Sequence, residues 1–309
     1  MTPEHAWPEL DSAACADTLA TLHLHTQIIG KVQLALRPPL AQWEQAPLRL
    51  TARGLESQLL LLPDGRTMTI ALDLTDRTAL LETSDGARRS IALVPSTVAD
   101  FHAGLMAALR ELDAAVSVGP LSVFTADPVA YESDTSHFTC DEGPTRALFQ
   151  TLTSVAGVFE QYRAGFWGKQ SPVNFWWGTF DLAVARYSSR AARPPQDAGL
   201  VDRTAMDAEQ ATVGFWPGDA EFAPRFFAYT YPVPRGLAAA VVGPEGAAWD
   251  DELGQFALLY DDVRTAPDPR AALLEFCEST YEAGSRLGGW DKRLLDRPVP
   301  AAAERPASA

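Results

Sequence analysis

The chain has 309 residues, of which 47% are hydrophobic and 21% charged, a composition typical of a folded protein with a sizeable core. Its 40 acidic and 25 basic residues give a formal charge of -15, which repels phosphate backbones and anionic headgroups and argues against nucleic acid and membrane partners. The opening MTPEHAWPELDS lacks the basic and apolar regions of a signal peptide, and no apolar run is long enough to span a bilayer, so we expect a cytoplasmic protein.

The first predicted element is a helix that begins at Asp11 or Ser12 and ends at Gly30, because a polar N-cap and a glycine stop enclose an apolar stripe. Apolar segments separated by turn residues follow and predict an antiparallel meander, with strands within 32–37, 48–55, 57–63, 67–74, 78–84 and 89–95. A helix over 96–114 closes this half, since Thr97 and Asp100 have capping-box spacing. Residues 117–124 suggest an additional edge strand.

A second half shows the same order of elements. A helix is predicted over 145–164, one long strand over 173–188, further strands over 225–231 and 254–262, and a closing helix over 269–287. The stretch 190–213 has no clear pattern and is long enough to indicate a functional loop or disorder.

We therefore predict an α+β protein of two pseudo-repeats, each a helix followed by an antiparallel meander sheet and a closing helix, packed as one compact body. The halves are 1–125 and 144–297, joined by an acidic crossing loop at 126–143 and followed by a disordered tail at 298–309. In this duplication, Lys31 and Arg53 correspond to Lys169 and Arg186, since a Gly-Lys pair and a strand-ending arginine recur. Chance is the alternative, because this order of elements is common.

Several long motifs occur in order along nearly the whole chain: WPEL at 7, TLHLHTQIIGK at 21, LTARGL at 50, GKQSPVNFWWGTFDLAVARYS at 168, GFWPG at 214, YTYPVPRG at 229 and LLEFCESTYEAG at 273. They resemble the bacterial family called domain of unknown function 5996, a resemblance that implies no particular activity. Relatives resemble PVHFFWGSFDLA and SHEVSSAGFWPG, whereas this chain has Asn174 and Ala208 at the two histidine positions and keeps Glu209. If those histidines serve a metal or a proton transfer, the resemblance implies that activity here is altered or absent.

Asp181 is the principal candidate for chemistry. Strand alternation places Leu182, Val184 and Arg186 on an apolar face and Asp181 on the other face, together with Phe175 and Trp177. In a partly dry pocket desolvation raises a carboxyl pKa, which suits acid–base work. The alternative is a structural carboxylate paired with an arginine or with backbone donors.

Cationic side chains suggest anchors for an anionic ligand. Arg186 can clamp a carboxylate or phosphate, or it can form a bridge within this acidic chain. Lys31 and Lys169 each follow a glycine at a predicted helix end, where a cation also complements the helix dipole. Arg53 is included as the counterpart of Arg186.

Histidine 23 is the second candidate for proton transfer. His23 and His25 point in different directions on a helix and cannot share one ion, and Gln27 lies beside His23 in a polar cluster. A hydrogen-bonded core histidine is the alternative. Cys15, Cys140 and Cys277 are odd in number and widely spaced, so we expect reduced thiols and no zinc site.

The leading hypothesis is a cofactor-independent enzyme that acts on a small, partly apolar or aromatic and anionic molecule in a pocket between the halves. Asp181 or His23 moves a proton, and the substrate contacts are Lys169, Arg186, Asn174, Trp177, Trp216, Gln27, Lys31 and Arg53. The aromatic segments around Trp216 and at 226–232 are candidates for the same wall, or for core packing. The other hypotheses are a non-catalytic binder or scaffold, and a metal-dependent enzyme that uses His23 and Glu209; the oligomeric state is open.

Overall fold

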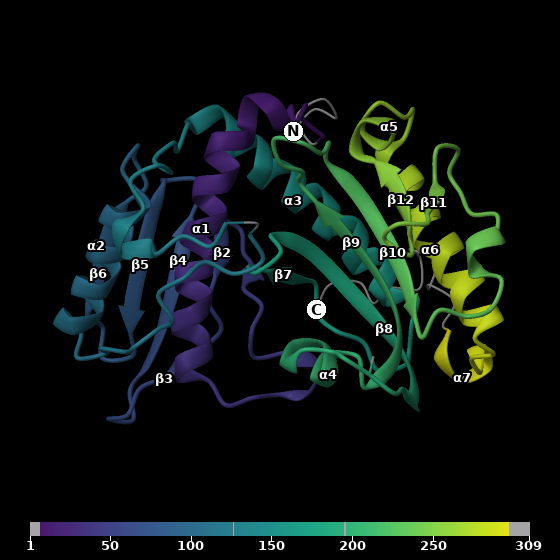
Figure 1. The fold of residues 1–309 in the computed structure, drawn as a ribbon, viewed down its shortest axis with the longest axis horizontal. Coiled ribbons are helices and arrows are strands. Elements are labelled where there is room, and N and C mark those ends of the chain that lie inside the picture. The colour runs from purple at the N-terminus through teal and green to yellow at the C-terminus, as the bar shows by residue number, and fades with distance from the viewer. Residues whose placement is uncertain (1–6, 126, 195, 297–309) are drawn as a thin grey trace, which may run out of the picture.

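The computed structural model describes residues 7–125, 127–194 and 196–296, which form two antiparallel sheets with helices packed on them (Figure 1). The predicted α+β class is confirmed. The predicted disordered tail at 298–309 lies outside the described residues.

Helix α1 (Ser12–Leu36) crosses the first half and runs on past the predicted stop (Figure 1). It begins at Asp11, whose carboxylate accepts the amide hydrogens of Ala13 and Ala14. The prediction that Gly30 ends the helix was wrong, and the strand predicted over 32–37 is the last part of α1. Gly30 serves packing instead, because a Cβ there would lie 2.3 Å from the ring of Trp177.

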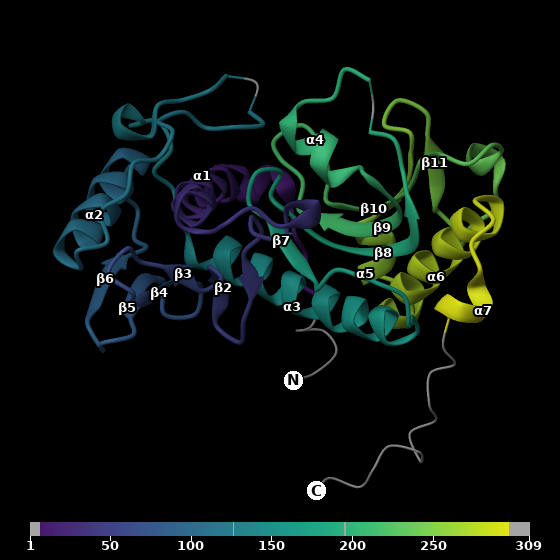
Figure 2. The same ribbon diagram turned by 90° about the horizontal axis from the view of Figure 1, so that it is seen from below.

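The first sheet has the strand order β1-β2-β4-β5-β6, with β3 paired to β4. Its strands are β1 (Arg49–Leu50), β2 (Gly54–Glu56), β3 (Leu60–Leu61), β4 (Thr67–Asp73), β5 (Thr78–Thr83) and β6 (Arg88–Ala92). Strands β4 and β5 alternate buried and half-buried side chains, as expected for a sheet with one covered face. Helices α1 and α2 (Val98–Glu111) cover that face, and α2 begins with the predicted capping box of Thr97 and Asp100 (Figure 2).

The segment between the halves is largely irregular. Residues 117–124 form no strand in the part described, and a single bridge joins Leu121 to Ala130. Three short 3-10 helices occur along the described chain: η2 (Ala41–Trp43), η3 (Tyr131–Ser133) and η4 (Leu237–Ala239).

The second sheet has the order β11-β12-β10-β9-β8-β7. Its strands are β7 (Asn174–Trp176), β8 (Asp181–Ala191), β9 (Ala208–Trp216), β10 (Arg225–Tyr231), β11 (Ala248–Asp250) and β12 (Gln255–Leu259). The helices of this half are α3 (Glu142–Ala164), α4 (Leu200–Ala205), α5 (Tyr260–Arg264), α6 (Pro269–Leu287) and α7 (Lys292–Leu295). Helices α3 and α6 cover one face of the sheet, and α4 lies over the other (Figure 2).

The long strand predicted over 173–188 is a hairpin. Residues Trp177–Phe180 form a turn between β7 and β8, and the backbone of Phe180 has φ 62°, a left-handed conformation that is rare for a bulky residue. Register therefore places Trp176 opposite Asp181. The predicted shared face of Trp177 and Asp181 was wrong because the chain reverses direction between them.

The two halves meet at β7, the edge of the second sheet. Leu48 and Phe175 exchange backbone hydrogen bonds of 2.9 and 3.0 Å, and the indole of Trp177 donates to the carbonyl of Ala46 at 2.8 Å. The pseudo-repeat is not confirmed, since Lys31 lies inside α1 whereas Lys169 lies in the loop after α3. Among the described helices, none has both the length and the apolar composition that crossing a bilayer requires.

Candidate functional site

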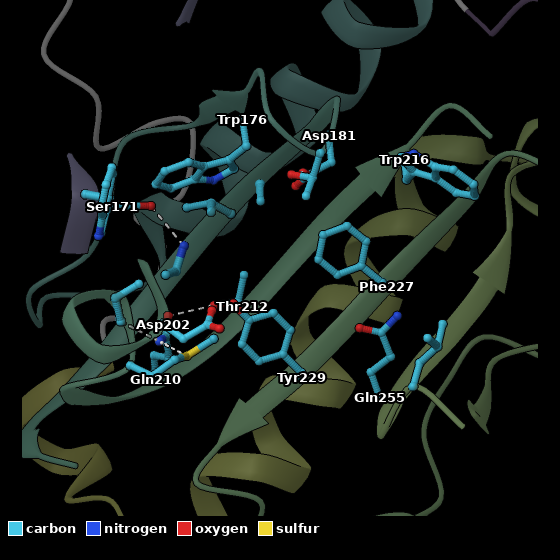
Figure 3. Close-up of a pocket in the computed structure, with 18 of the residues that line it drawn as sticks. Ser171, Trp176, Asp181, Asp202, Gln210, Thr212, Trp216, Phe227, Tyr229 and Gln255 are labelled. Atoms are coloured by element: carbon cyan, nitrogen blue, oxygen red, sulfur yellow. Dashed lines mark hydrogen bonds between the residues drawn. The ribbon is translucent and has the colours of Figure 1, made fainter. Parts of the chain in front are cut away.

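A cavity of about 650 Å³ lies on the α4 side of the second sheet (Figure 3). This volume is in the range of small-molecule sites in proteins. Its lining comes mainly from strands β8, β9 and β10, from α4, and from η2 of the first half. The lining residues are Gln42, Trp43, Ser171, Trp176, Thr179, Asp181, Ala183, Val184, Ala185, Tyr187, Val201, Asp202, Ala205, Met206, Gln210, Thr212, Trp216, Phe222, Arg225, Phe227, Tyr229, Asp250, Glu252, Leu253 and Gln255.

Small side chains in the middle of the sheet create the hollow. Ala183 on β8 pairs with Gly214 on β9, which in turn pairs with Phe227 on β10. A Cβ at Gly214 would lie 2.1 Å from the ring of Phe227, so glycine is what allows this ring to lean across the sheet. Ala183 and Ala185 therefore make the floor, and the ring of Phe227, which lies over Gly214, makes a wall.

Asp181 stands at one end of the hollow between two tryptophans (Figure 3). Trp176 is directly opposite it on β7. Because Leu182 pairs with Phe215, the next residues outward, Asp181 and Trp216, lie on neighbouring strands and both line the cavity. Arg225 pairs with Trp216 on the strand beyond, so these four residues form one row across the sheet.

Asp181 is buried, with 7% of the residue's surface exposed. The hydroxyl of Thr179 donates a hydrogen bond to its Oδ1, and in the described part of the chain no Lys, Arg or His forms an ion pair with it. Burial raises the pKa of Asp181 to about 7, while the Thr179 hydrogen bond opposes this rise. A carboxyl with this pKa can accept or donate a proton near neutral pH.

Helix α4 and η2 cover the cavity from the side opposite the sheet. The indole of Trp43 donates a hydrogen bond to the hydroxyl of Thr204, and the amide of Gln42 donates to Asp207 Oδ1 at 2.7 Å. The stretch 190–213, predicted without regular structure, in fact ends β8 and contains α4 and the start of β9. It supplies Asp202 and Met206 to the lining.

Of the predicted site residues, Asp181 and Trp216 line the cavity and the others do not. Trp177 is buried beneath Ala46 and against Gly30, and Trp176 takes the place in the wall that we expected for Trp177. The alternation within β8 was predicted correctly, since Asp181 lies on the cavity face of the sheet and Arg186 on the face covered by α3 and α6.

Arg186 is a structural residue on the helix-covered face, with 1% of its surface exposed. Its guanidinium carbon lies 3.4 Å from the ring centroid of Tyr162 and 4.4 Å from that of Tyr281, and both terminal nitrogens donate to Glu278 at 3.2 Å. The charge is thus enclosed by protein partners and does not reach the cavity.

His23 lies behind the β7–β8 turn rather than in the cavity. Its ring stacks on Phe180 at 4.9 Å, and its Nε2 lies 3.0 Å from the carbonyl oxygen of Gly178 and 3.0 Å from Gln27 Nε2. The amide of Gln27 is bonded to the backbone of Val123 and accepts from Tyr131. Burial lowers the pKa of His23. The surroundings of His23 are those of a hydrogen-bonded core histidine, the alternative given by the sequence.

The remaining predicted substrate contacts also lie outside the cavity lining. Lys31 donates to the carbonyls of Gly119 and Leu121. Arg53 pairs with two surface aspartates, and Lys169 is exposed in the loop before β7. Asn174 is fully buried between Arg49, which donates to it, and Glu44, which accepts from it.

The pair suggested for a metal site is not assembled. Glu209 accepts hydrogen bonds from Ser188 and Arg190, whereas His23 contacts Gly178 and Gln27. Across the described ranges, no three His, Cys, Asp or Glu side chains gather in a way that would hold a metal ion.

The sequence reasoning missed several cavity residues on both sides of the floor, namely Trp176, Thr179, Gln210, Thr212 and Arg225. The glycine of the WWGTF segment was the available signal, because a turn at Gly178 would have placed Trp176 opposite Asp181. Phe227 and Tyr229 belong to an aromatic segment that was considered for the wall, and both line it.

Comparison with known proteins gives a family and no activity. No curated protein and no solved structure matches the chain. One family model, described as a family of unknown function (DUF5996), matches residues 7–297, nearly the whole chain. The resemblance noted from the motifs is therefore confirmed, and the chain belongs to the DUF5996 family.

Proposed function

We propose that the cavity is the active site of a cofactor-independent enzyme in which Asp181 moves a proton to or from a small, partly apolar or aromatic molecule. The observation that carries this proposal is a buried carboxyl, aimed into a cavity between two tryptophans, with no ion-pair partner among the described residues. Structural carboxylates are normally paired when buried, whereas catalytic ones are left with a raised pKa.

The immediate surroundings suit a single acid–base group. Thr179 holds Oδ1 of Asp181 through its hydroxyl, which leaves Oδ2 as the oxygen available to a bound molecule. Flat walls from Trp176 and Trp216 can hold an aromatic or apolar body beside that oxygen. A pKa of about 7 gives both protonation states at neutral pH, so the same group serves as acid and as base.

The four predicted anchors for an anionic substrate are absent from the cavity lining, namely Lys31, Arg53, Lys169 and Arg186, so we no longer propose an anionic substrate. Arg225 is the one Lys or Arg among the lining residues that the structure describes.

A non-catalytic binding protein is the second candidate function. It is favoured by one observation, the position of His23 outside the cavity, which leaves Asp181 as the one of the two predicted proton-transfer residues that lines it.

The experiment that separates the two begins with a mass-spectrometric search for small molecules that co-purify with the protein. The recovered compound is then incubated with the wild type, with Asp181→Asn and with Asp251→Asn, a control at an exposed carboxylate outside the cavity lining. We expect turnover by the wild type and the control and at least a hundredfold loss in Asp181→Asn. Turnover by Asp181→Asn at the wild-type rate overturns the proposal, and ligand-induced melting shifts without product favour the binding protein.

A cytoplasmic location belongs to this proposal. It is supported by three buried free thiols, Cys15, Cys140 and Cys277, which suit a reducing compartment.

A further inference from the structure

The charges on the cavity wall are unevenly distributed. Four carboxylates line it, and the one guanidinium among the described lining residues is that of Arg225; the carboxylates are those of Asp181, Asp202, Asp250 and Glu252. With one cation against four acids, the wall favours a positively charged occupant.

Arg225 does not neutralise Asp181. Its guanidinium carbon lies 5.4 Å from the ring centroid of Phe222 and 5.9 Å from that of Trp216, and its Nε donates to the carbonyl of Ala223 at 3.3 Å. No ion pair joins Arg225 to any carboxylate in the described ranges. Trp216 stands between the two residues in the row across the sheet, so within 7–125, 127–194 and 196–296 the carboxyl of Asp181 has no counter-ion.

Aromatic side chains supply a second preference for a cation. Trp176, Trp216, Phe227 and Tyr229 line the cavity, and the last two rings are nearly parallel, at 6° and 6.4 Å. The face of an aromatic ring is negative, so such walls attract an ammonium group and also accept an apolar body.

We infer that the cavity binds a compound in which a protonated amine is joined to an apolar or aromatic body, with the ammonium against Asp181 and the body between the tryptophans. This inference concerns the site of the proposed function and rests on its location, although it does not require turnover. An ammonium would supply the counter-ion that the buried carboxyl lacks, and its hydrogen bonds would satisfy Oδ2.

Three probes of the same shape test it: tryptamine, the corresponding alcohol tryptophol, and the acid indole-3-propionate. Their affinities for the whole chain are measured by calorimetry at pH 8. We expect tryptamine to bind about tenfold more tightly than tryptophol, and the acid to bind most weakly. Asp181→Asn should remove most of the preference for tryptamine over tryptophol, and Asp251→Asn, outside the lining, should leave all three affinities as in the wild type.

Equal affinities for the amine and the alcohol, tighter binding of the acid, or no binding by any probe would each overturn the inference. An amine preference that survives in Asp181→Asn would place the cation elsewhere and overturn the role given to Asp181. Since these are binding measurements, an amine preference without turnover would support the inference while the catalytic proposal fails. If the enzyme instead turns over a neutral or anionic compound, and Asp181→Asn abolishes that turnover, the catalytic proposal is supported while the inference of an amine ligand fails.

Discussion

Strand β8 carries a buried charged group on each of its faces, and the two are treated in opposite ways. On the face covered by α3 and α6, Arg186 is enclosed by Tyr162, Tyr281 and Glu278. On the cavity face, Asp181 has a hydroxyl from Thr179 and no counter-ion in the described structure. Burial of a charge is tolerated when the protein supplies its partners. This contrast is the reason for our proposal that a ligand completes the face of Asp181.

The largest effect is expected on the helix-covered face. Arg186→Ala should lower the free energy of unfolding by about 3 kcal/mol, because the change leaves a cavity and removes contacts with aromatic rings and Glu278. Urea denaturation measures the difference. Arg190→Ala is the matched control, since Arg190 is on the same strand but 48% of its side chain is exposed beside Glu209, and its loss should cost under about 1 kcal/mol. If the two variants lose equal free energy of unfolding, the enclosed Arg186 is no more important for stability than the exposed Arg190.

Asp181→Asn should change the free energy of unfolding in the opposite direction, by raising it. Burial raises the pKa of Asp181 from 3.8 to about 7, so the folded protein keeps a proton that the unfolded chain has already lost. The stability due to this proton is present at acid pH and is lost as the pH rises from about 4 through about 7. The full shift corresponds to roughly 4 kcal/mol, and water entering the cavity reduces it.

We therefore expect Asp181→Asn to be more stable than the wild type by about 2 kcal/mol at pH 8, and the gain to shrink toward pH 4. Urea denaturation at pH 8 and pH 4.5 tests this expectation, with Asp251→Asn as the exposed control. A loss of stability at pH 8 would mean that the carboxylate has a structural role.

The third variant is at Gly214 on β9, beside Ala183 of the cavity floor. Gly214→Ala should cost about 1.5 kcal/mol, because the new Cβ meets the ring of Phe227 and forces it to move. Gly104→Ala is the control, since its Cβ would make only an ordinary contact with Ile91 at 3.7 Å and alanine favours helix α2 there. If the two alanine variants have equal melting temperatures in thermal unfolding, the ring of Phe227 is not closely packed on Gly214.

The smallest effect concerns the hydroxyl that holds Asp181. Thr179→Val removes a hydrogen bond that lowers the pKa of this carboxyl, so the pKa should rise further, by about 0.7 pH units or about 1 kcal/mol. Carbon-detected NMR titration of the aspartate carboxyls measures the pKa of Asp181. The Asp181 resonance is identified because it is missing from the spectrum of Asp181→Asn. Thr179→Ser keeps the hydroxyl and should restore the wild-type value, whereas a pKa unchanged by valine would contradict the assigned contact.

Within residues 181–187, the regular part of β8, the sequence was sufficient, because a strand without a bulge obeys simple alternation. Leu182 and Arg186 were placed on the core face and Asp181 on the other, as the structure has them. Prediction failed where distant contacts decide the backbone. The left-handed Phe180 is supported by the rings of His23 and Phe175, which come from another helix and another strand.

Gly30 shows the same limitation. A glycine before a lysine is an ordinary helix stop in sequence, yet here the helix continues and the missing Cβ makes room for Trp177. The cavity itself was equally hidden, because it depends on the register of Ala183, Gly214 and Phe227 on three strands, and register is not visible in any one segment.

The pairing of Leu48 with Phe175 has a consequence for assembly of the chain. A free sheet edge offers unpaired backbone groups to other molecules, and β7 is such an edge. Residues 45–47, whose carbonyls are held by Gln33, lie just before Leu48 and are synthesised well ahead of β7. In the folded chain the first half therefore acts as an intramolecular cap on β7. We expect a second half made without it to present this edge to its own copies and self-associate.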